Sequence, residues 1–267
     1  RKNIFVKNQA RALKFQGIIT KQIYKNLTEG ETMKKFRSLL LCVAAAATLS
    51  AQSESEDKVE KITSIDIYVS PFYSAKEGKP EYVHVYDPID DLLMKNDVAS
   101  LKKAIKIIEN APDMVAPTTL MTVAARAYDL GLKDDAVFWF YAGKNRFLTF
   151  ARVIDIKDEI FRETESANAA FLQLVGNVVN PYAFCDLAKQ RDAAARARDW
   201  VKAHPYKAIF DEKFPSHFAD RAAALKAAED KMDAALLRQD EFFADPAKKA
   251  DFLAKRKAND TDKRFCD

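Results

Sequence analysis

The sequence predicts a mainly α fold, built of antiparallel helical hairpins and preceded by a small N-terminal β-hairpin. Apolar residues recur at helical spacing from residue 89 onward, and proline and glycine separate these periods. A shorter stretch before residue 89 alternates with the period of two that is typical of strands. The expected order along the chain is a non-native upstream extension (1–32), a signal peptide (33–51), an acidic linker (52–60), the β-hairpin (61–88), the α-helical domain (89–258) and a flexible tail (259–267).

The segment from Met33 to Ala51 has the three-part organisation of a secretory signal peptide. Three cations at 34–37 precede an apolar run at 39–47, and small residues lead to a cleavage site between Ala51 and Gln52. The apolar run at 39–47 has nine residues, fewer than the roughly twenty that span a bilayer. The segment therefore predicts a periplasmic or secreted bacterial protein that keeps no integral membrane anchor after cleavage.

Two other interpretations of this segment stay open, a buried core helix and a lipoprotein signal in which Cys42 is lipidated. The lipoprotein interpretation is disfavoured because Leu41 stands where a small residue is expected. Residues 1–32 show no clean helical or strand period, and we expect them to be translated upstream sequence. A long native n-region of the signal peptide is the alternative.

Removal of residues 1–51 changes the sign of the net charge. The whole chain has 43 Lys and Arg against 39 Asp and Glu, a net charge of +4. Residues 1–51 hold ten of these cations and two of the anions, which leaves 33 cations, 37 anions and a net charge of −4. Because binding to nucleic acid and to anionic membranes depends on clustered positive charge, this balance argues against both kinds of partner.

The chain after residue 51 keeps two cysteines, Cys185 and Cys266. An even number of cysteines in an exported protein is typical of disulfide pairing. A bond between these two would join the C-terminal tail to the middle of the fold. The alternative is that Cys185 is a small buried apolar residue and that Cys266 is a free thiol.

Strands are predicted at 61–70 and 81–86, with a loop that contains glycine and proline between them. A two-stranded hairpin is marginally stable alone, so its Ile and Val side chains should pack on the helices. The second strand places Tyr82, His84 and Tyr86 on its other face. This stripe is either an interaction surface or, as is commoner for aromatic stripes, a packing surface.

Capping and breaking residues predict the boundaries of the first helices. Asp97 is expected to be the N-cap of a helix that ends at Pro112. The next helix is expected to begin at Pro117 and to end before Gly131, because proline suits the first turn and glycine suits the position after the last.

Asp134 or Asp135 is expected to cap a third helix. Its unbroken apolar run at 136–142 predicts burial on several sides. Further helices are expected at 161–178, where Asn180-Pro181 follows as a breaker, at 184–203, at about 217–238 with Ser216 as N-cap, and at 247–257.

Small and aromatic residues in the second and third helices follow a recognisable spacing: Ala124, Tyr128, Gly131, Asp135, Ala136, Trp139 and Ala142. This pattern, at about residues 117–145, resembles one degenerate unit of a tetratricopeptide repeat or of its Sel-type relatives. The apolar run at 136–142 is the closest part of the resemblance. The resemblance implies two antiparallel helices that must stack on neighbouring helices to bury their faces.

No residue pattern indicates a cofactor or a metal ion. The histidines His84, His204 and His217 are not clustered and have no ligand-spaced partners. Glycines are too few for a phosphate-binding loop. Cys185 could form a nucleophile pair with a distant histidine, but a buried structural role for this cysteine is much better supported. We therefore expect no cofactor, no metal and no catalytic residue of these types.

Three carboxylates, Glu159, Glu163 and Glu165, are the remaining candidates for chemistry. Glycosidic cleavage uses a pair of acids, so an envelope glycan or peptide hydrolase is the rival enzyme hypothesis. Acids four residues apart beside cations more commonly form a solvated helix face. The preferred hypothesis is an exported interaction module whose partner is another envelope protein or a secreted effector, which it would restrain as an immunity-type inhibitor does.

Overall fold

The computed structural model describes residues 61–62, 74–76, 79–81 and 89–266, and this part is mainly helical, as the sequence predicted. None of its helices is both long and apolar enough to cross a membrane. The helices are α2 (Asp90–Leu93), α3 (Val98–Asn110), α4 (Pro117–Asp129), α5 (Lys133–Val153), α6 (Arg162–Ala183), α7 (Leu187–Ala203), α8 (Arg221–Ala244), α9 (Pro246–Ala258) and α10 (Thr261–Phe265), with short 3-10 turns η1 (Pro112–Met114), η2 (Glu159–Phe161) and η3 (Lys207–Phe210).

A short antiparallel pair of strands lies where the sequence predicted the loop of the hairpin. It consists of β1 (Ser74–Lys76) and β2 (Lys79–Glu81), with Ala75 opposite Pro80. Most of each longer predicted strand, 63–70 and 82–86, lies outside the described residues.

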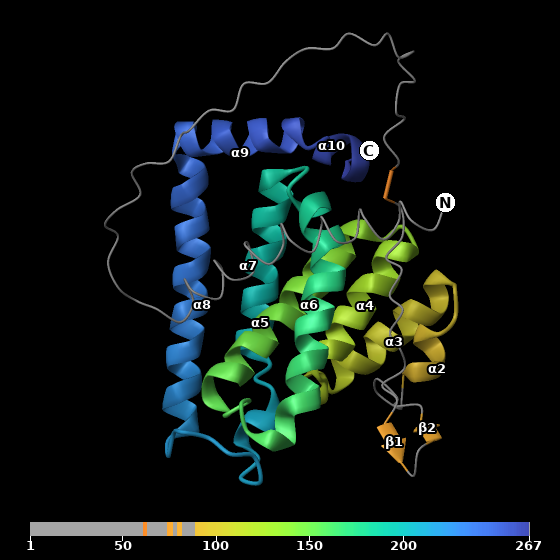
Figure 1. Ribbon diagram of the computed structural model, residues 1–267, viewed down its shortest axis with the longest axis vertical. Helices are drawn as coiled ribbons and strands as arrows, with labels where there is room; N and C mark the ends of the chain where they lie inside the picture. Colours follow the sequence, from red (N-terminus) through yellow and green to blue (C-terminus); the bar gives the residue numbers. More distant parts are fainter. Residues whose placement is uncertain (1–60, 63–73, 77–78, 82–88, 267) are drawn as a thin grey trace, which may run out of the picture. The chain divides into compact units, whose positions relative to one another are not determined.

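Helix α5 is the centre of the fold and packs against α4, α6, α7 and α8 (Figure 1). Residues 139–143 are all buried, which confirms the prediction of a helix covered on several sides. The first partner of α5 is α4, which precedes it and runs antiparallel. At their crossing a Cβ atom on Gly143 would lie 2.8 Å from Met121 Cγ and 3.0 Å from the Pro117 carbonyl oxygen. The absence of a side chain at this position lets the two backbones approach.

Several helix boundaries agree with the sequence prediction. Asp97 caps α3 by accepting a hydrogen bond from the Ser100 amide at 2.7 Å. Pro117 occupies the first turn of α4, and Gly131 follows that helix with a φ of 79°, a conformation that favours glycine.

Other boundaries differ from the prediction for physical reasons. Asp134 and Asp135 lie inside the first turn of α5 instead of capping it, and Leu132 is the N-cap. Helix α6 passes through Pro181 to Ala183, because amides beyond the proline keep their bonds, such as the Phe184 amide to the Asn180 carbonyl. Proline in the last turn removes one hydrogen bond without preventing the next.

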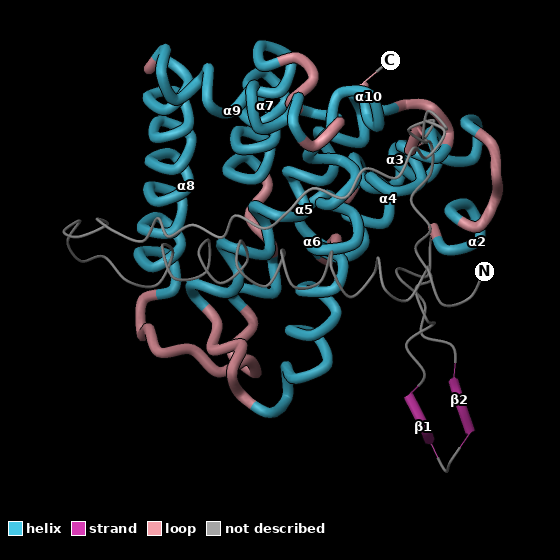
Figure 2. Tube along the Cα trace, turned by 45° about the horizontal axis from the view of Figure 1, so that its top comes forward, coloured by secondary structure: helices cyan, strands magenta, loops and turns pink. Residues whose placement is uncertain are grey.

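The long helix α8 begins later than predicted, because Asp220 supplies its N-cap by accepting from the Ala223 amide. Ser216, the predicted cap, instead binds the Val153 carbonyl and the Phe218 amide. Figure 2 shows the resulting loop beside the end of α5. The Asp155 amide also donates to the Pro215 carbonyl at 2.9 Å, so loops 154–161 and 204–220 lie together at one end of the bundle.

The C-terminal arm, defined as α8, α9 and α10, runs along α5 and α7 and then turns across the opposite end of the bundle (Figure 1). The tail that was predicted to be flexible contains α10, and Phe265 is buried. The Ile62 amide donates to the Arg264 carbonyl at 2.8 Å. Residues at 261–266 are therefore tied to the fold.

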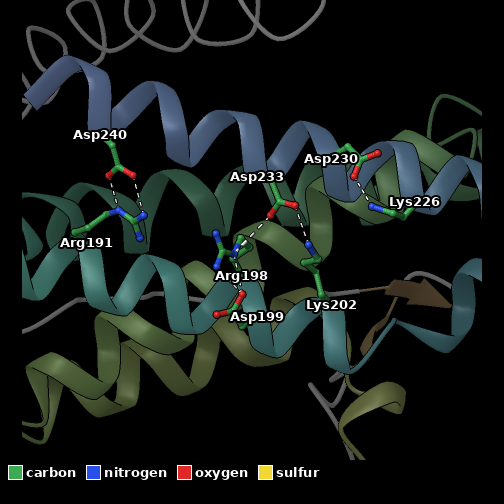
Figure 3. Close-up of polar contacts among 8 residues, drawn as sticks. All are labelled: Arg191, Arg198, Asp199, Lys202, Lys226, Asp230, Asp233 and Asp240. Atoms are coloured by element: carbon green, nitrogen blue, oxygen red, sulfur yellow. Dashed lines mark hydrogen bonds and ion pairs between the residues drawn. The ribbon is translucent and has the colours of Figure 1, made fainter. Parts of the chain in front are cut away.

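Charged side chains of α7 and α8 form ion pairs between the two helices, as Figure 3 shows. Arg191 forms two hydrogen bonds with Asp240, one of them at 2.8 Å. Lys202 donates to Asp233 at 2.8 Å, and Arg198 lies 3.5 Å from the same carboxylate. These groups are partly exposed, so each pair contributes only about 0 to 1 kcal/mol. These ion pairs define where α8 lies against α7, but they contribute little to the stability of the protein.

Candidate functional site

A pocket of about 340 Å³ lies where the two loops at the end of the bundle meet the beginning of α6. Its walls come from residues 116–118 at the start of α4, the end of α5, η2, α6 and the loop that contains η3. This volume is at the small end of the range, about 300 to 1,000 Å³, of pockets that bury small molecules. The pocket is the candidate functional site.

Helix α6 supplies one wall of the pocket through residues spaced for a single helical face. Glu163, Ala167 and Phe171 recur at four-residue intervals, and Asn168 adjoins them. Ala167, Asn168 and Phe171 are buried, whereas Glu163 is exposed. The wall therefore changes from an apolar floor to an acidic mouth.

Aromatic rings form the opposite side of the pocket. The Phe150 and Phe161 rings meet edge to face at 5.6 Å between centroids, and Phe214 meets Phe161 at 5.1 Å. Tyr206 contacts Phe150 at 5.6 Å. All four rings line the pocket and belong to a second core cluster, or pack on it, at the end of α5. The site thus has an apolar aromatic interior.

Two polar side chains in the lining have unused hydrogen-bonding or charge capacity. Asn168 is 2% exposed, and its amide nitrogen donates to the Thr164 carbonyl at 2.8 Å. Its Oδ1 atom has no hydrogen-bond partner among the described residues. Glu163 is the only charged residue in the lining, and within the described part of the chain no cation forms an ion pair with it. The pocket therefore offers one buried acceptor and one carboxylate that are not used by the described residues.

Two arginines hold the loop that carries the Tyr206 and Phe214 rings. Arg146 is completely buried and donates to the carbonyls of Pro112 at 2.6 Å, Val115 at 2.8 Å and His204 at 2.7 Å. Burial lowers the pKa of Arg146 to about 10. The guanidinium also lies 4.6 Å from the Trp200 ring centroid and 5.7 Å from that of Tyr206, and burial raises the pKa of the Tyr206 phenol.

The second arginine, Arg221 at the start of α8, donates to the carbonyls of Ile209, Asp211 and Phe214, at 3.0, 2.6 and 2.6 Å. Carbonyls of an irregular loop need donors when they leave solvent. The two guanidinium groups supply them and thereby place the aromatic side of the pocket.

Cys185 and Cys266, the cysteines considered for pairing from the sequence, are joined by a disulfide, with their Cα atoms 5.7 Å apart. Arg256, 6% exposed, donates to the Pro181 carbonyl at 3.0 Å and to the Asp262 carboxylate at 2.7 Å. Its guanidinium also lies 3.5 Å from the Cys266 sulfur. The bond and the arginine attach α10 to the C-terminal end of α6, whereas the pocket lies at the beginning of that helix.

The structure separates the three acids considered for catalysis. Glu159 accepts from Arg162 at 3.0 Å, and Glu165 pairs with Lys157. Only Glu163 lines the pocket.

The remaining candidate residues have structural contacts or lie outside the described part. The His204 ring packs on Trp200 at 5.2 Å, and the His217 ring lies 3.2 Å from the Asp155 carboxylate. Among the described residues no group of three His, Cys, Asp or Glu side chains is placed to hold a metal ion. The cleavage site at Ala51 and Gln52 and the stripe of Tyr82, His84 and Tyr86 lie outside the described residues.

Sequence reasoning missed the pocket because its parts come from distant segments. One signal was available: Glu163, Ala167, Asn168 and Phe171 share one helical face that is polar at its start and apolar at its end. The rings at 206 and 214 gave no such signal, since no periodicity links an irregular loop to a helix.

Comparisons with known proteins give one informative relative. No family model matches the chain, and no solved structure matches it significantly. An uncharacterized protein of Haemophilus influenzae is 44% identical over 207 residues, which cover 78% of this chain and 80% of the relative. At this identity and coverage, the chain belongs to the same family as the Haemophilus influenzae protein.

Proposed function

We propose that this protein is exported to the periplasm or secreted and acts there as a protein–protein interaction module. The observation that carries the proposal is the disulfide between Cys185 and Cys266. Disulfides persist in oxidising compartments and are rare in the reducing cytosol. The signal-like segment at 33–51 supplies a route to such a compartment.

Binding is favoured over hydrolysis because the acids do not converge. Glycosidic cleavage by two carboxylates needs both beside the scissile bond, about 5 to 10 Å apart. Glu159 and Glu165 are paired with Arg162 and Lys157, which leaves Glu163 as the single acid at the pocket. An aromatic pocket with one acid suits recognition better than this chemistry.

The helical architecture is consistent with an interaction module. Helices α4 and α5 form an antiparallel pair that crosses closely at Gly143, and α6 and α7, which follow, both pack on α5. We interpret the first pair as a tetratricopeptide-like unit and the stretch at 61–88 as a small hairpin that precedes it. Stacked helical pairs present extended surfaces to other proteins. The partner is another envelope protein or a secreted effector that this protein restrains.

Fractionation tests the location. We expect the full chain, expressed in a bacterial host, to be recovered from the periplasm or medium with an N-terminus at or near Gln52 and with both cysteines resistant to alkylation. The control is a variant in which Leu40→Arg interrupts the apolar run, which should stay in the cytoplasm with alkylable thiols. Cytoplasmic retention of the unaltered chain, with an N-terminus at Arg1, contradicts the proposal.

A partner assay tests the activity separately. The exported protein should retain an identified envelope or secreted protein after crosslinking in intact cells, and the purified pair should re-form. Activity on peptidoglycan that Glu163→Gln abolishes, without any re-forming pair, would instead support the hydrolase.

A further inference from the structure

We propose that the pocket beside α6 binds an organic ammonium group, that is, a protonated amine carried on a small apolar or aromatic body. The inference does not depend on export or on a protein partner. It rests on three features of the lining: rings that attract cations, an acid without a partner, and a buried acceptor without a donor.

The aromatic rings favour a ligand that combines a positive charge with an apolar body. Phe150, Phe161, Phe214 and Tyr206 meet in a continuous series of ring contacts. Ring faces attract cations through their quadrupole, most strongly where water is excluded. The same rings favour an apolar ligand body by removing its surface from water. A fully polar ion such as free ammonium would use only the first of these attractions.

The charged group in the described lining is an acid, and two cations of the same segment are bound to other acids. Arg162 is bound to Glu159, and Lys157 is bound to Glu165. Among the described residues, Glu163 is the only charged one in the lining, and it lies at the mouth of the pocket. An anionic ligand would be repelled by this carboxylate, whereas an ammonium group would form a charge-assisted hydrogen bond with it.

Asn168 adds a preference for a ligand that donates hydrogen bonds. A buried amide oxygen without a partner costs folding free energy, and a ligand N–H group that reaches it after a small shift of the Asn168 side chain regains part of that cost. The amide nitrogen of Asn168 is already committed to the Thr164 carbonyl, so the oxygen is the free atom. Arg146, which would repel a cation, is not part of the lining, and its guanidinium is held by three carbonyls.

The test compares three ligands of the same size by isothermal titration of the full chain at pH 7 and low salt. These are 2-phenylethylamine, 2-phenylethanol and phenylacetate, which are cationic, neutral and anionic. We expect the amine to bind about tenfold more tightly than the alcohol, with phenylacetate weakest. Equal affinities, or no heat from the amine up to millimolar concentration, overturn the assignment.

Two variants identify the groups responsible. Glu163→Gln should weaken amine binding about fivefold and leave alcohol binding unchanged, because Glu163 is exposed and contributes through its charge. Glu241→Gln on α8 is the control, since it removes an exposed acid that does not line the pocket and that has no ion pair among the described residues, and it should change neither affinity. Unchanged amine binding in Glu163→Gln overturns the role of the acid.

A pocket-filling variant and a lysine probe complete the design. Ala167→Leu should abolish binding of the amine and the alcohol while circular dichroism shows intact helices, and retained binding would place the ligand elsewhere. Nα-acetyl-lysine amide carries the same ammonium group as a protein side chain does. Tighter binding of this probe than of 2-phenylethylamine would assign the site to a lysine of a protein, whereas weaker binding assigns it to a free amine.

Discussion

Arg146 is a buried cation that is stabilised by backbone carbonyls instead of by a carboxylate partner. Its guanidinium is fully buried, yet no described carboxylate lies within ion-pair distance, and three backbone carbonyls accept its protons instead. These carbonyls belong to η1, to the residue after it and to the end of α7. One side chain therefore links the η1 segment to the end of α7 by hydrogen bonds. Trp200 covers the guanidinium face.

Replacement of Arg146 should therefore be costly. We expect Arg146→Met to lower the free energy of unfolding by at least about 2 kcal/mol, because buried carbonyls lose their donors at about 1 to 3 kcal/mol each. Urea unfolding followed by far-ultraviolet circular dichroism measures this change. The control is Arg196→Met on α7, where the arginine is exposed and, among the described residues, contacts Asp192 and Phe138, and where a change within about 0.5 kcal/mol is expected. Equal effects would contradict the role of Arg146.

Tyr141 makes stability depend on pH in the alkaline range. Burial raises the pKa of Tyr141 to about 12, against an ordinary value of 10.0, although a hydrogen bond with Gln190 partly opposes the shift. Between these values the unfolded chain loses the phenol proton and the folded chain keeps it. The stability contributed by the protonated phenol is therefore complete below pH 10 and is lost as the pH rises to 12.

Tyr141→Phe should remove this dependence. Relative to the variant, the unaltered protein should lose roughly 2 to 3 kcal/mol of unfolding free energy between pH 10 and 12, since one pKa unit corresponds to about 1.4 kcal/mol. Urea titrations at pH 7, 9, 10, 11 and 12 measure the difference between the two proteins. That difference should be constant from pH 7 to 9, and parallel curves up to pH 12 would show that Tyr141 does not titrate in this way.

At the level of elements, α4 and α5 depend on a close approach at Gly143. In a helix interior, alanine is more favourable than glycine by about 1 kcal/mol. Helix propensity alone therefore predicts that Gly143→Ala stabilises the protein. The Cβ would lie 3.0 Å from a backbone oxygen, Pro117 O, which cannot turn away as a side chain does. We expect a net loss of about 1 to 2 kcal/mol, because the helices must separate.

The control for this variant is Gly131→Ala. Gly131 has open space around its Cβ position but a φ of 79°, so its loss, about 1 kcal/mol, should come from backbone strain alone. Crystal structures of both variants should show a shift of α4 only in Gly143→Ala. An unshifted and equally stable Gly143→Ala protein would contradict the close crossing.

Element boundaries show how far local sequence reasoning reaches. Asp97 and Gly131 were predicted correctly, because their roles depend on their own backbone conformation and the nearest amides. The capping role predicted for Asp134 was wrong, because its carboxylate instead accepts a hydrogen bond from the hydroxyl of Tyr182 on α6, at 2.8 Å. This hydrogen bond is the main reason that the pKa of Asp134 is lowered. A side chain that has a partner from another helix is not available as a cap.

For the whole molecule, the disulfide between Cys185 and Cys266 determines how firmly the C-terminal arm is held. It closes a loop with a sequence separation of 81 residues that contains α7, α8, α9 and α10. By the chain-entropy relation its removal should lower the unfolding free energy by about 4 to 5 kcal/mol.

The double variant Cys185→Ser, Cys266→Ser tests this contribution by urea unfolding. Dithiothreitol should lower the thermal midpoint of the unaltered protein and leave that of the variant unchanged. Hydrogen exchange should then accelerate first in α9 and α10, which the bond and Arg256 attach to the end of α6. A variant as stable as the oxidised protein would contradict a stabilising role.

The sequence by itself determined the helical class, the buried position of the third helix and most helix boundaries, because periodicity and capping are local properties. It also brought the two cysteines into consideration as a pair. Only the tertiary structure decided which side chains meet: Glu163 and Asn168 with rings from η2, α5 and the loop after α7, and Arg146 with three carbonyls. The physical reason is that an irregular loop takes its path from donors and rings on distant helices, and no spacing along the chain encodes those distances.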